Sequence, residues 1–270
     1  MTIEKFEPKS ARIMVTPEIA REWLKDNEKN RPVSPNLVKN YARAIAEGRW
    51  KLNGETIKFS PSGALLDGQH RLLACLQAKL PFETIVMRDV SPDSFDTIDV
   101  GRKRTAGDII GLEGCKNATV TAAGIRWVLT IRRGLSSDGA VLVSADEVRQ
   151  LWLNDPRFEV SATAVHGLRS VIRPSIAAAL HYLFGEKDEA AADFFFARLK
   201  SGTEMSFDNP IFVLRERLIR NNTEKLKLKN GEVAALTIRA WNCFRAGQTT
   251  RNLKGSITGK DGEFIMPIIK

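Results

Sequence analysis

The spacing of apolar residues predicts two helices near the start of the chain. Apolar positions recur at helical spacing over residues 17–27 and again over 34–50, and the residues ahead of the first segment are expected to be irregular. In the second segment Ser34 is suited to the N-cap, Pro35 to the first helical position and Gly48 to the C-terminal cap. We therefore expect a well-delimited helix over this segment.

The period then changes to that of strands. Alternating apolar and polar residues predict a strand over 55–60, and short apolar runs predict strands over 64–66 and 84–90, with a helix over 71–78 between them. Beyond residue 112 the pattern is almost wholly helical, with helices expected near 117–133, 144–153, 173–184, 187–200, 210–221 and 231–246. The prediction is an α+β protein, with a mixed α/β domain over 1–112 and a mainly helical domain over 113–270.

Composition limits the environment and the class of partner. The net charge of +9 and the isoelectric point near 9.6 favour a polyanionic partner, either DNA or a nucleotide. No apolar run approaches the roughly 20 residues of a membrane span, so no membrane association is expected. The three cysteines are isolated, which fits a reducing cytoplasm and suggests neither a disulfide framework nor a zinc site.

The segment 64-ALLDGQHRLLACLQA-78 places five polar or special residues between a strand and a helix. A glycine turn that leads into a helix N-terminus is suited to anions, because the first-turn amides have no intrahelical acceptor. Gly68 allows a phosphate to approach the backbone, while Gln69, His70 and Arg71 supply donors around it. Asp67 is expected either to cap the helix or to reach a magnesium ion that a nucleotide carries. The alternative is a plain cap and turn with no ligand.

A second basic cluster precedes another predicted helix start. Arg102, Lys103 and Arg104 come immediately before Thr105, which is suited to capping the helix that follows. We expect Arg102 and Arg104 to contribute to binding nucleotide phosphates. Asp99 is expected to share a metal ion, to orient one of the arginines or to close a turn. The alternative for the whole cluster is a solvated basic loop.

The candidates for acid–base chemistry are few. Glu55 precedes the strand that is expected beside the turn, and its carboxylate is suited to act as a general base toward water or a hydroxyl group. Asp67 and His70 complete the expected catalytic set, with Mg²⁺ on Asp67. The alternative for Glu55 is a surface residue at a strand edge. His181 has no carboxylate neighbour in the sequence, so no metal site is expected there.

Three stretches together resemble a known superfamily. They are 50-WKLNGETIKFS-60, 66-LDGQHRLLAC-75 and 98-IDVGRKRTAGD-108, and their order is similar to that in ParB/sulfiredoxin-like proteins, especially the ParB-domain proteins of bacteriophages and mobile elements. The resemblance implies a nucleotide-binding fold, with phosphate binding by Gly68, His70 and Arg71. Gln69 stands where sulfiredoxins have their reactive cysteine, so sulfinic acid repair is not implied. The helical half shows no helix-turn-helix signature, so the partitioning role of ParB does not transfer.

These observations lead to one expected function and several alternatives. We expect a cytoplasmic ParB-like protein that binds a nucleoside triphosphate with Mg²⁺ and acts on or with DNA, with hydrolysis of the triphosphate as a compatible activity. A kinase-like phosphotransferase with Glu55 as its base is one alternative. A metal-dependent nuclease that uses Glu55, Asp67 and Asp99 is another. An interaction protein with a vestigial site is the last.

Overall fold

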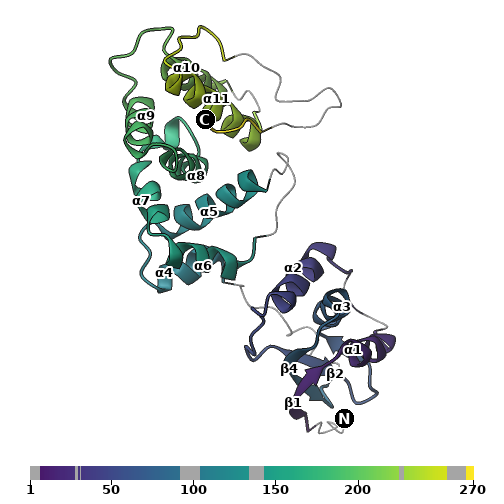
Figure 1. Ribbon diagram of the computed structural model, residues 1–270. Helices are drawn as coiled ribbons and strands as arrows, with labels where there is room; N and C mark the ends of the chain where they lie inside the picture. Colours follow the sequence, from purple (N-terminus) through teal and green to yellow (C-terminus); the bar gives the residue numbers. More distant parts are fainter. Residues whose placement is uncertain are drawn as a thin grey trace. The chain divides into compact units, whose positions relative to one another are not determined.

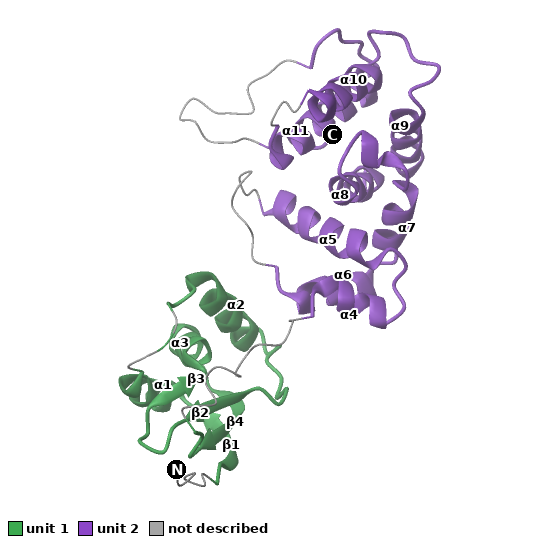
Figure 2. Ribbon diagram, turned by 180° about the vertical axis from the view of Figure 1, so that it is seen from behind, with its two compact units in different colours: residues 1–103 green, residues 104–270 purple. Residues whose placement is uncertain are grey.

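The chain divides into two compact units, residues 1–103 and residues 104–270 (Figure 2). The computed structural model describes residues 7–27, 30, 32–91, 104–133, 143–224, 228–253 and 266–270. The boundary lies before α4 (Ala106–Leu112), whereas the sequence pattern placed it after residue 112. The reason is that α4 packs on α5 (Ala118–Arg132) and α6 (Ala145–Asn154), so its apolar side chains belong to the helical core of the second unit.

Unit 1 contains a four-stranded mixed sheet. Its strand order is β1-β4-β2-β3, with β1 antiparallel to β4, β2 parallel to β4, and β3 antiparallel to β2. The strands are β1 (Lys9–Val15), β2 (Thr56–Phe59), β3 (Leu65–Asp67) and β4 (Phe82–Arg88). Strands β2, β3 and β4 confirm the strands predicted over 55–60, 64–66 and 84–90, and the sheet is mixed, as predicted.

Strand β1 is the element of unit 1 that the sequence pattern missed. Most of its residues are exposed and only Val15 is buried, so the alternation of apolar and polar positions is weak. It forms through a full ladder to β4, from Lys9 opposite Arg88 to Val15 opposite Phe82. An edge strand of this kind depends on pairing with a distant segment, and a local pattern does not record that pairing.

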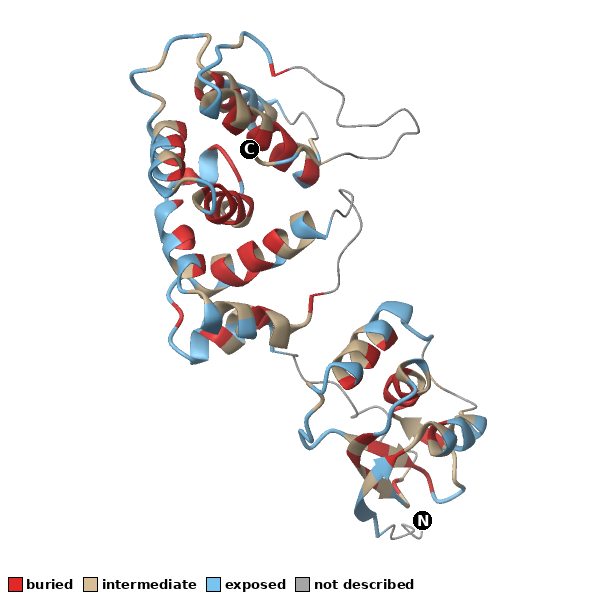
Figure 3. Cartoon of the chain, viewed as in Figure 1, coloured by how far each residue is buried: buried red, intermediate tan, exposed pale blue. Residues whose placement is uncertain are grey.

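Helices cover the sheet and bury its apolar face (Figures 1 and 3). They are α1 (Pro17–Trp23), η1 (Leu24–Asp26), α2 (Pro35–Ala46) and α3 (Gln69–Ala78). Ser34 caps α2 through its hydroxyl group, which accepts a hydrogen bond from the Leu37 amide at 3.4 Å, and Gly48 follows the helix with φ of +65°. Both features confirm the sequence prediction. The alternate residues Ile57 and Phe59 of β2 point into this core, 0% and 1% exposed.

Unit 2 is built of helices only, within the residues that the structure describes. After α4 to α6 come α7 (Arg157–Ala164), η3 (Leu168–Ser170), α8 (Pro174–Gly185), α9 (Glu189–Ser201), α10 (Pro210–Thr223) and α11 (Asn230–Arg245). Helix α7 was not expected from the sequence, and the other long helices were. Across the described segments, no helix combines the length and the apolarity that crossing a membrane requires.

Helix α8 is the centre of unit 2. Every residue from Ile176 to Phe184 is buried, and α5, α7, α9 and α11 pack around this helix (Figure 3). Small residues allow the close approach of α5, since a Cβ on Gly124 would lie 3.3 Å from the Cβ of Ala178. Phe184 stacks on Trp241 of α11 with ring centroids 4.3 Å apart. An apolar helix surrounded on all sides is typical of the core of a helical domain.

One ion pair at the edge of this core makes the stability of unit 2 depend on pH. The hydrogen bonds from Arg157, and with them that from Tyr182, lower the pKa of Asp155 to about 2 from its ordinary value of 3.8. A carboxylate with a depressed pKa stabilises the folded state above its unfolded pKa, and this contribution is lost as the pH falls toward the folded pKa. The Asp155 contribution is therefore complete above about pH 4 and is lost between about pH 4 and pH 2.

We expect Asp155→Asn to make the decline in melting temperature between pH 5 and pH 2 shallower than in the wild type, because the variant has no carboxylate to protonate. Thermal unfolding followed by circular dichroism across this range measures the effect. Glu189→Gln is the matched control, since this exposed carboxylate on α9 has no ion-pair partner among the described residues. If the melting temperature fell equally steeply with pH in the wild type and in Asp155→Asn, the contribution of Asp155 to the pH dependence would be refuted.

Candidate functional site

The candidate site of unit 1 is the turn between β3 and α3. Gly68 is the N-cap of α3 and has φ of +111°, in the left-handed region that side chains disfavour. A Cβ at this position would lie 2.8 Å from Cγ1 of Ile57 in the neighbouring strand. The turn therefore requires glycine for two reasons, the backbone conformation and the close approach of β2.

Asp67 holds two cations at the end of β3. Its Oδ2 accepts a hydrogen bond from Lys58 Nζ at 3.0 Å and another from Arg71 Nη2 at 3.1 Å. All three side chains are largely shielded from water, with exposed fractions of 13% for Asp67, 21% for Lys58 and 10% for Arg71. Ion pairs with this degree of burial are screened less than surface pairs. The cluster keeps one net positive charge beside the turn.

The expectation that Asp67 caps α3 is wrong. The N-cap of this helix is Gly68, which has no side chain to form a cap hydrogen bond. The Asp67 carboxylate is instead engaged by Lys58 and by Arg71, which lies four residues further along the chain. Asp67 is therefore engaged by cations and does not cap the first turn of α3.

Arg71 carries an unsatisfied donor inside the protein. The residue is 8% exposed, and Nη1 of its guanidinium group is fully shielded yet has no hydrogen-bond partner among the described residues. Buried donors are nearly always paired, and leaving one unpaired costs about 1–3 kcal/mol, more for a charged group. An acceptor that is not part of the described chain, such as a phosphate oxygen, would remove this cost once the side chains that cover Nη1 move aside to admit it.

Gln69 and His70 are more deeply buried than a ligand-facing turn predicts. Gln69 is 3% exposed, and its Oε1 accepts a hydrogen bond from Asn27 Nδ2 at 3.3 Å. His70 is 6% exposed, and its Nε2 accepts from the Ser34 amide at 3.0 Å. This bond leaves the neutral ring with its proton on Nδ1. Both side chains tie α3 to the segment between η1 and α2, so their structural role stands beside the expected phosphate contact.

Glu55 lies at the expected end of the sheet. It directly precedes β2, which runs antiparallel to β3, so it occupies the end where β3 passes into α3. Its side chain is exposed, and its carboxylate has no ion pair or hydrogen bond with the described residues. Such a carboxylate is accessible to water or to a substrate hydroxyl group.

Metal binding has less support from the geometry. Within the described residues no group of three or more histidine, cysteine, aspartate or glutamate side chains is suited to hold a metal ion. Oδ2 of Asp67 is already shared by two cations, which disfavours a direct Mg²⁺ bond to that oxygen. Asp99, the other expected metal ligand, lies outside the described residues.

The second basic cluster is only partly described. Arg102 lies outside the described residues, and Arg104 is exposed just before α4. Thr105 caps α4 as expected: its Oγ1 accepts from the Asp108 amide at 3.2 Å, and Asp108 Oδ2 accepts from the Thr105 amide at 2.8 Å. The start of this helix is therefore already occupied by an anionic side chain, which weakens its suitability for phosphate.

Two residues were missed or misjudged from the sequence. Lys58 was not assigned to the site, although its position between the inward-facing Ile57 and Phe59 places it on the opposite face of β2, across from Asp67. His181 was expected to lack a carboxylate neighbour, but its Nε2 lies 2.9 Å from Asp193 Oδ1 on the next helix. The alternation of residues in β2 could have indicated the position of Lys58. The contact between His181 and Asp193 arises from helix packing, which the sequence pattern does not indicate.

Cys75 is part of the core, as expected. It is fully buried on α3, and burial raises the pKa of its thiol to about 11. A thiol with a raised pKa is protonated near neutral pH and unreactive as a nucleophile. Thiol chemistry is therefore not an explanation for this turn.

Comparisons of the chain with protein-family models, with curated proteins and with solved structures found no match. The assignment of the site accordingly depends on its own geometry.

The close contact at Gly68 gives a test of the turn. We expect Gly68→Ala to lower the free energy of unfolding by about 2–4 kcal/mol, because it combines a left-handed backbone with a steric overlap against Ile57. Gly63→Ala is the matched control: φ is +88° there, but nothing lies within 4 Å of the added Cβ, so about 1 kcal/mol is expected. Denaturant unfolding, monitored by tryptophan fluorescence, measures the free energy of unfolding of both variants. Equal losses of this free energy would refute the close approach of Gly68 to Ile57.

Proposed function

We propose that this chain is a ParB-like nucleotide-binding protein that acts on or with DNA, and that the turn from Gly68 to Arg71 binds the phosphates of a nucleoside triphosphate. The observation that carries the proposal is the shielded Nη1 of Arg71, which has no partner among the described residues. The resemblance of the LDGQHR and GRKRTAGD stretches to the ParB/sulfiredoxin-like superfamily supports the same ligand.

Each residue of the turn would have a separate role in binding the phosphate. Gly68 lets the phosphate approach the backbone, and the positive end of the α3 dipole favours the negative charge of the phosphate. Arg71 donates from Nη1 while its Nη2 remains on Asp67, so Asp67 acts as the positioning residue for the guanidinium group. Lys58 neutralises Asp67 on its other side, so that the carboxylate does not repel the incoming phosphate.

Hydrolysis of the triphosphate is compatible with the same arrangement. The exposed Glu55 carboxylate lies at the end of β2 near the turn and is suited to accept a proton from water. Arg71 and the amides of α3 would stabilise the charge on the phosphoryl oxygens. When bound with the nucleotide, Mg²⁺ would supply further neutralisation of the phosphates.

A kinase-like phosphotransferase is the second candidate. The observation in its favour is again Glu55, because an exposed carboxylate without a partner can accept the proton of a substrate hydroxyl group as readily as that of water. A metal-dependent nuclease depends on Asp99 as a metal ligand, and this residue lies outside the described residues.

Arg71 gives the test of the proposal. We expect a panel of nucleoside triphosphates with Mg²⁺ to include at least one that raises the melting temperature of the wild type, corresponding to about 2.7 kcal/mol at a ligand concentration of 100 times Kd. Arg71→Lys, which keeps the charge on Asp67 but loses the guanidinium fork, should weaken binding about tenfold or more.

Arg21→Ala is the matched control, since this exposed cation on α1 lies outside the turn and should leave binding unchanged. Direct calorimetric titration separates lost binding from lost stability. Equal nucleotide affinity in wild type and Arg71→Lys, or no nucleotide binding by the wild type, would refute the phosphate site.

A further inference from the structure

Three arginines from separate elements of unit 2 line one open hollow. Arg126 comes from α5, Arg169 from η3 and Arg173 from the N-cap of α8, and all three are exposed. The hollow has a volume of about 860 Å³, and its lining also includes Trp127 and several hydroxyl and amide groups but no carboxylate. A cavity with this lining is suited to an anion.

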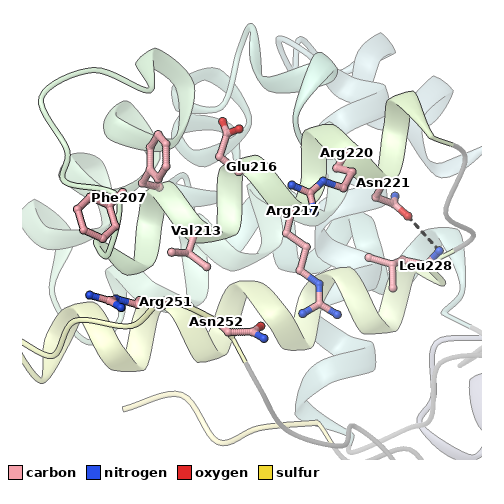
Figure 4. Close-up of a pocket in the computed structure, with 10 residues that line it drawn as sticks. Phe207, Val213, Glu216, Arg217, Arg220, Asn221, Leu228, Arg251 and Asn252 are labelled. Carbon is pink, nitrogen blue, oxygen red and sulfur yellow. Dashed lines mark hydrogen bonds between the residues drawn. The ribbon is translucent and has the colours of Figure 1, made fainter.

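Three further arginines line a second hollow, about 550 Å³ in volume, along α10 (Figure 4). Arg217 and Arg220 lie on α10, and Arg251 comes from the segment after α11. The aromatic ring of Phe207 is 68% exposed at this site, and the Arg251 guanidinium lies 5.7 Å from its centroid. Glu216, the one acidic residue of this lining, is within 3.5 Å of Arg215.

A smaller hollow of about 260 Å³ has lining residues in common with both. It shares Arg173 and Asn222 with the first hollow, and Asn221 and Leu228 with the second. The two asparagines are held in place, because Asn222 Nδ2 donates to Ser170 O at 2.9 Å and Asn221 Oδ1 accepts from the Leu228 amide at 3.1 Å (Figure 4). The three hollows are therefore adjacent on unit 2, and we call the arginines that line them the arginine track: Arg126, Arg169, Arg173, Arg217, Arg220 and Arg251.

The charges along this track are largely uncompensated. Arg126, Arg169 and Arg173 form no ion pair within the described part of the chain, and Arg220 reaches Glu224 only at 3.9 Å. Other arginines of unit 2 are compensated, since Arg132, Arg133 and Arg149 each pair with a glutamate at 3.0 Å or less. Unpaired guanidinium groups in a row repel one another unless an external anion lies between them.

We propose that the arginine track binds a single strand of DNA. A row of adjacent hollows fits an extended polyanion better than a compact one, and guanidinium groups at intervals match a phosphate backbone. The exposed ring of Phe207 beside Arg251 is a surface on which a base stacks, a feature typical of single-strand binding. The inference rests on the DNA part of the proposed function and is independent of nucleotide binding by unit 1.

The test uses the full-length protein and a fluorescent oligodeoxythymidine of about 20 nucleotides, with binding followed by anisotropy at several salt concentrations. Arg126→Gln/Arg173→Gln removes cations at one end of the track, and Arg220→Gln/Arg251→Gln removes them at the other. Each double variant should weaken binding about tenfold or more. The slope of log K against log salt concentration should also become shallower by about 1.4, which corresponds to two lost phosphate contacts. Phe207→Ala should weaken binding about fivefold or more through lost stacking.

Lys116→Gln/Lys187→Gln is the charge-matched control, because both lysines are exposed in unit 2 and lie outside the track. It should change affinity less than twofold. The proposal is overturned if the control weakens binding as much as the track variants, if only one end of the track matters, or if a duplex of equal length binds more tightly than the single strand.

The same preparations separate this proposal from that for unit 1. If the track variants lose DNA binding but keep nucleotide binding, the arginine track binds DNA independently of the turn in unit 1. Failure of the Arg71 test alongside intact strand binding refutes the nucleotide site and leaves the track standing.

Discussion

The carboxylate of Asp67 is the interaction on which the candidate site depends. One oxygen of this group accepts hydrogen bonds from both Lys58 and Arg71, and all three side chains are mostly shielded from water. Removing one partner of such a cluster leaves an uncompensated charge in a low-dielectric environment, which is strongly destabilising. The carboxylate therefore holds the Arg71 guanidinium group at the turn that follows β3.

The same cluster explains why the turn is suited to an anion. Two cations share one carboxylate, so a positive charge remains beside the start of α3. Arg71 is also left with one shielded nitrogen that nothing in the described residues satisfies. A phosphate supplies negative charge and acceptor oxygens together, and so meets both needs. In unit 2 the arrangement is different, because the cations are exposed and spaced along a row of hollows.

Much of the architecture follows from local patterns in the chain. The helix that begins at Pro35 has its stop and start signals in the sequence, and the strand from Thr56 to Phe59 shows clear alternation. The elements that escaped prediction, β1 and α7, have weak patterns. The polar residues of β1 face solvent at a sheet edge, and its existence depends on a ladder to β4 that begins about 70 residues further along the chain.

The sequence by itself determined the class of the protein, the glycine turn before α3 and the residues gathered at that turn, because these depend on periodicity and on neighbours in the chain. Only the tertiary structure decided what those residues do. It placed Lys58 opposite Asp67, turned Asp67 from a helix cap into an anchor for Arg71, and buried His70 against Ser34. Pairing between strands and packing between helices bring together residues that are distant in the chain, and such contacts leave no local signature.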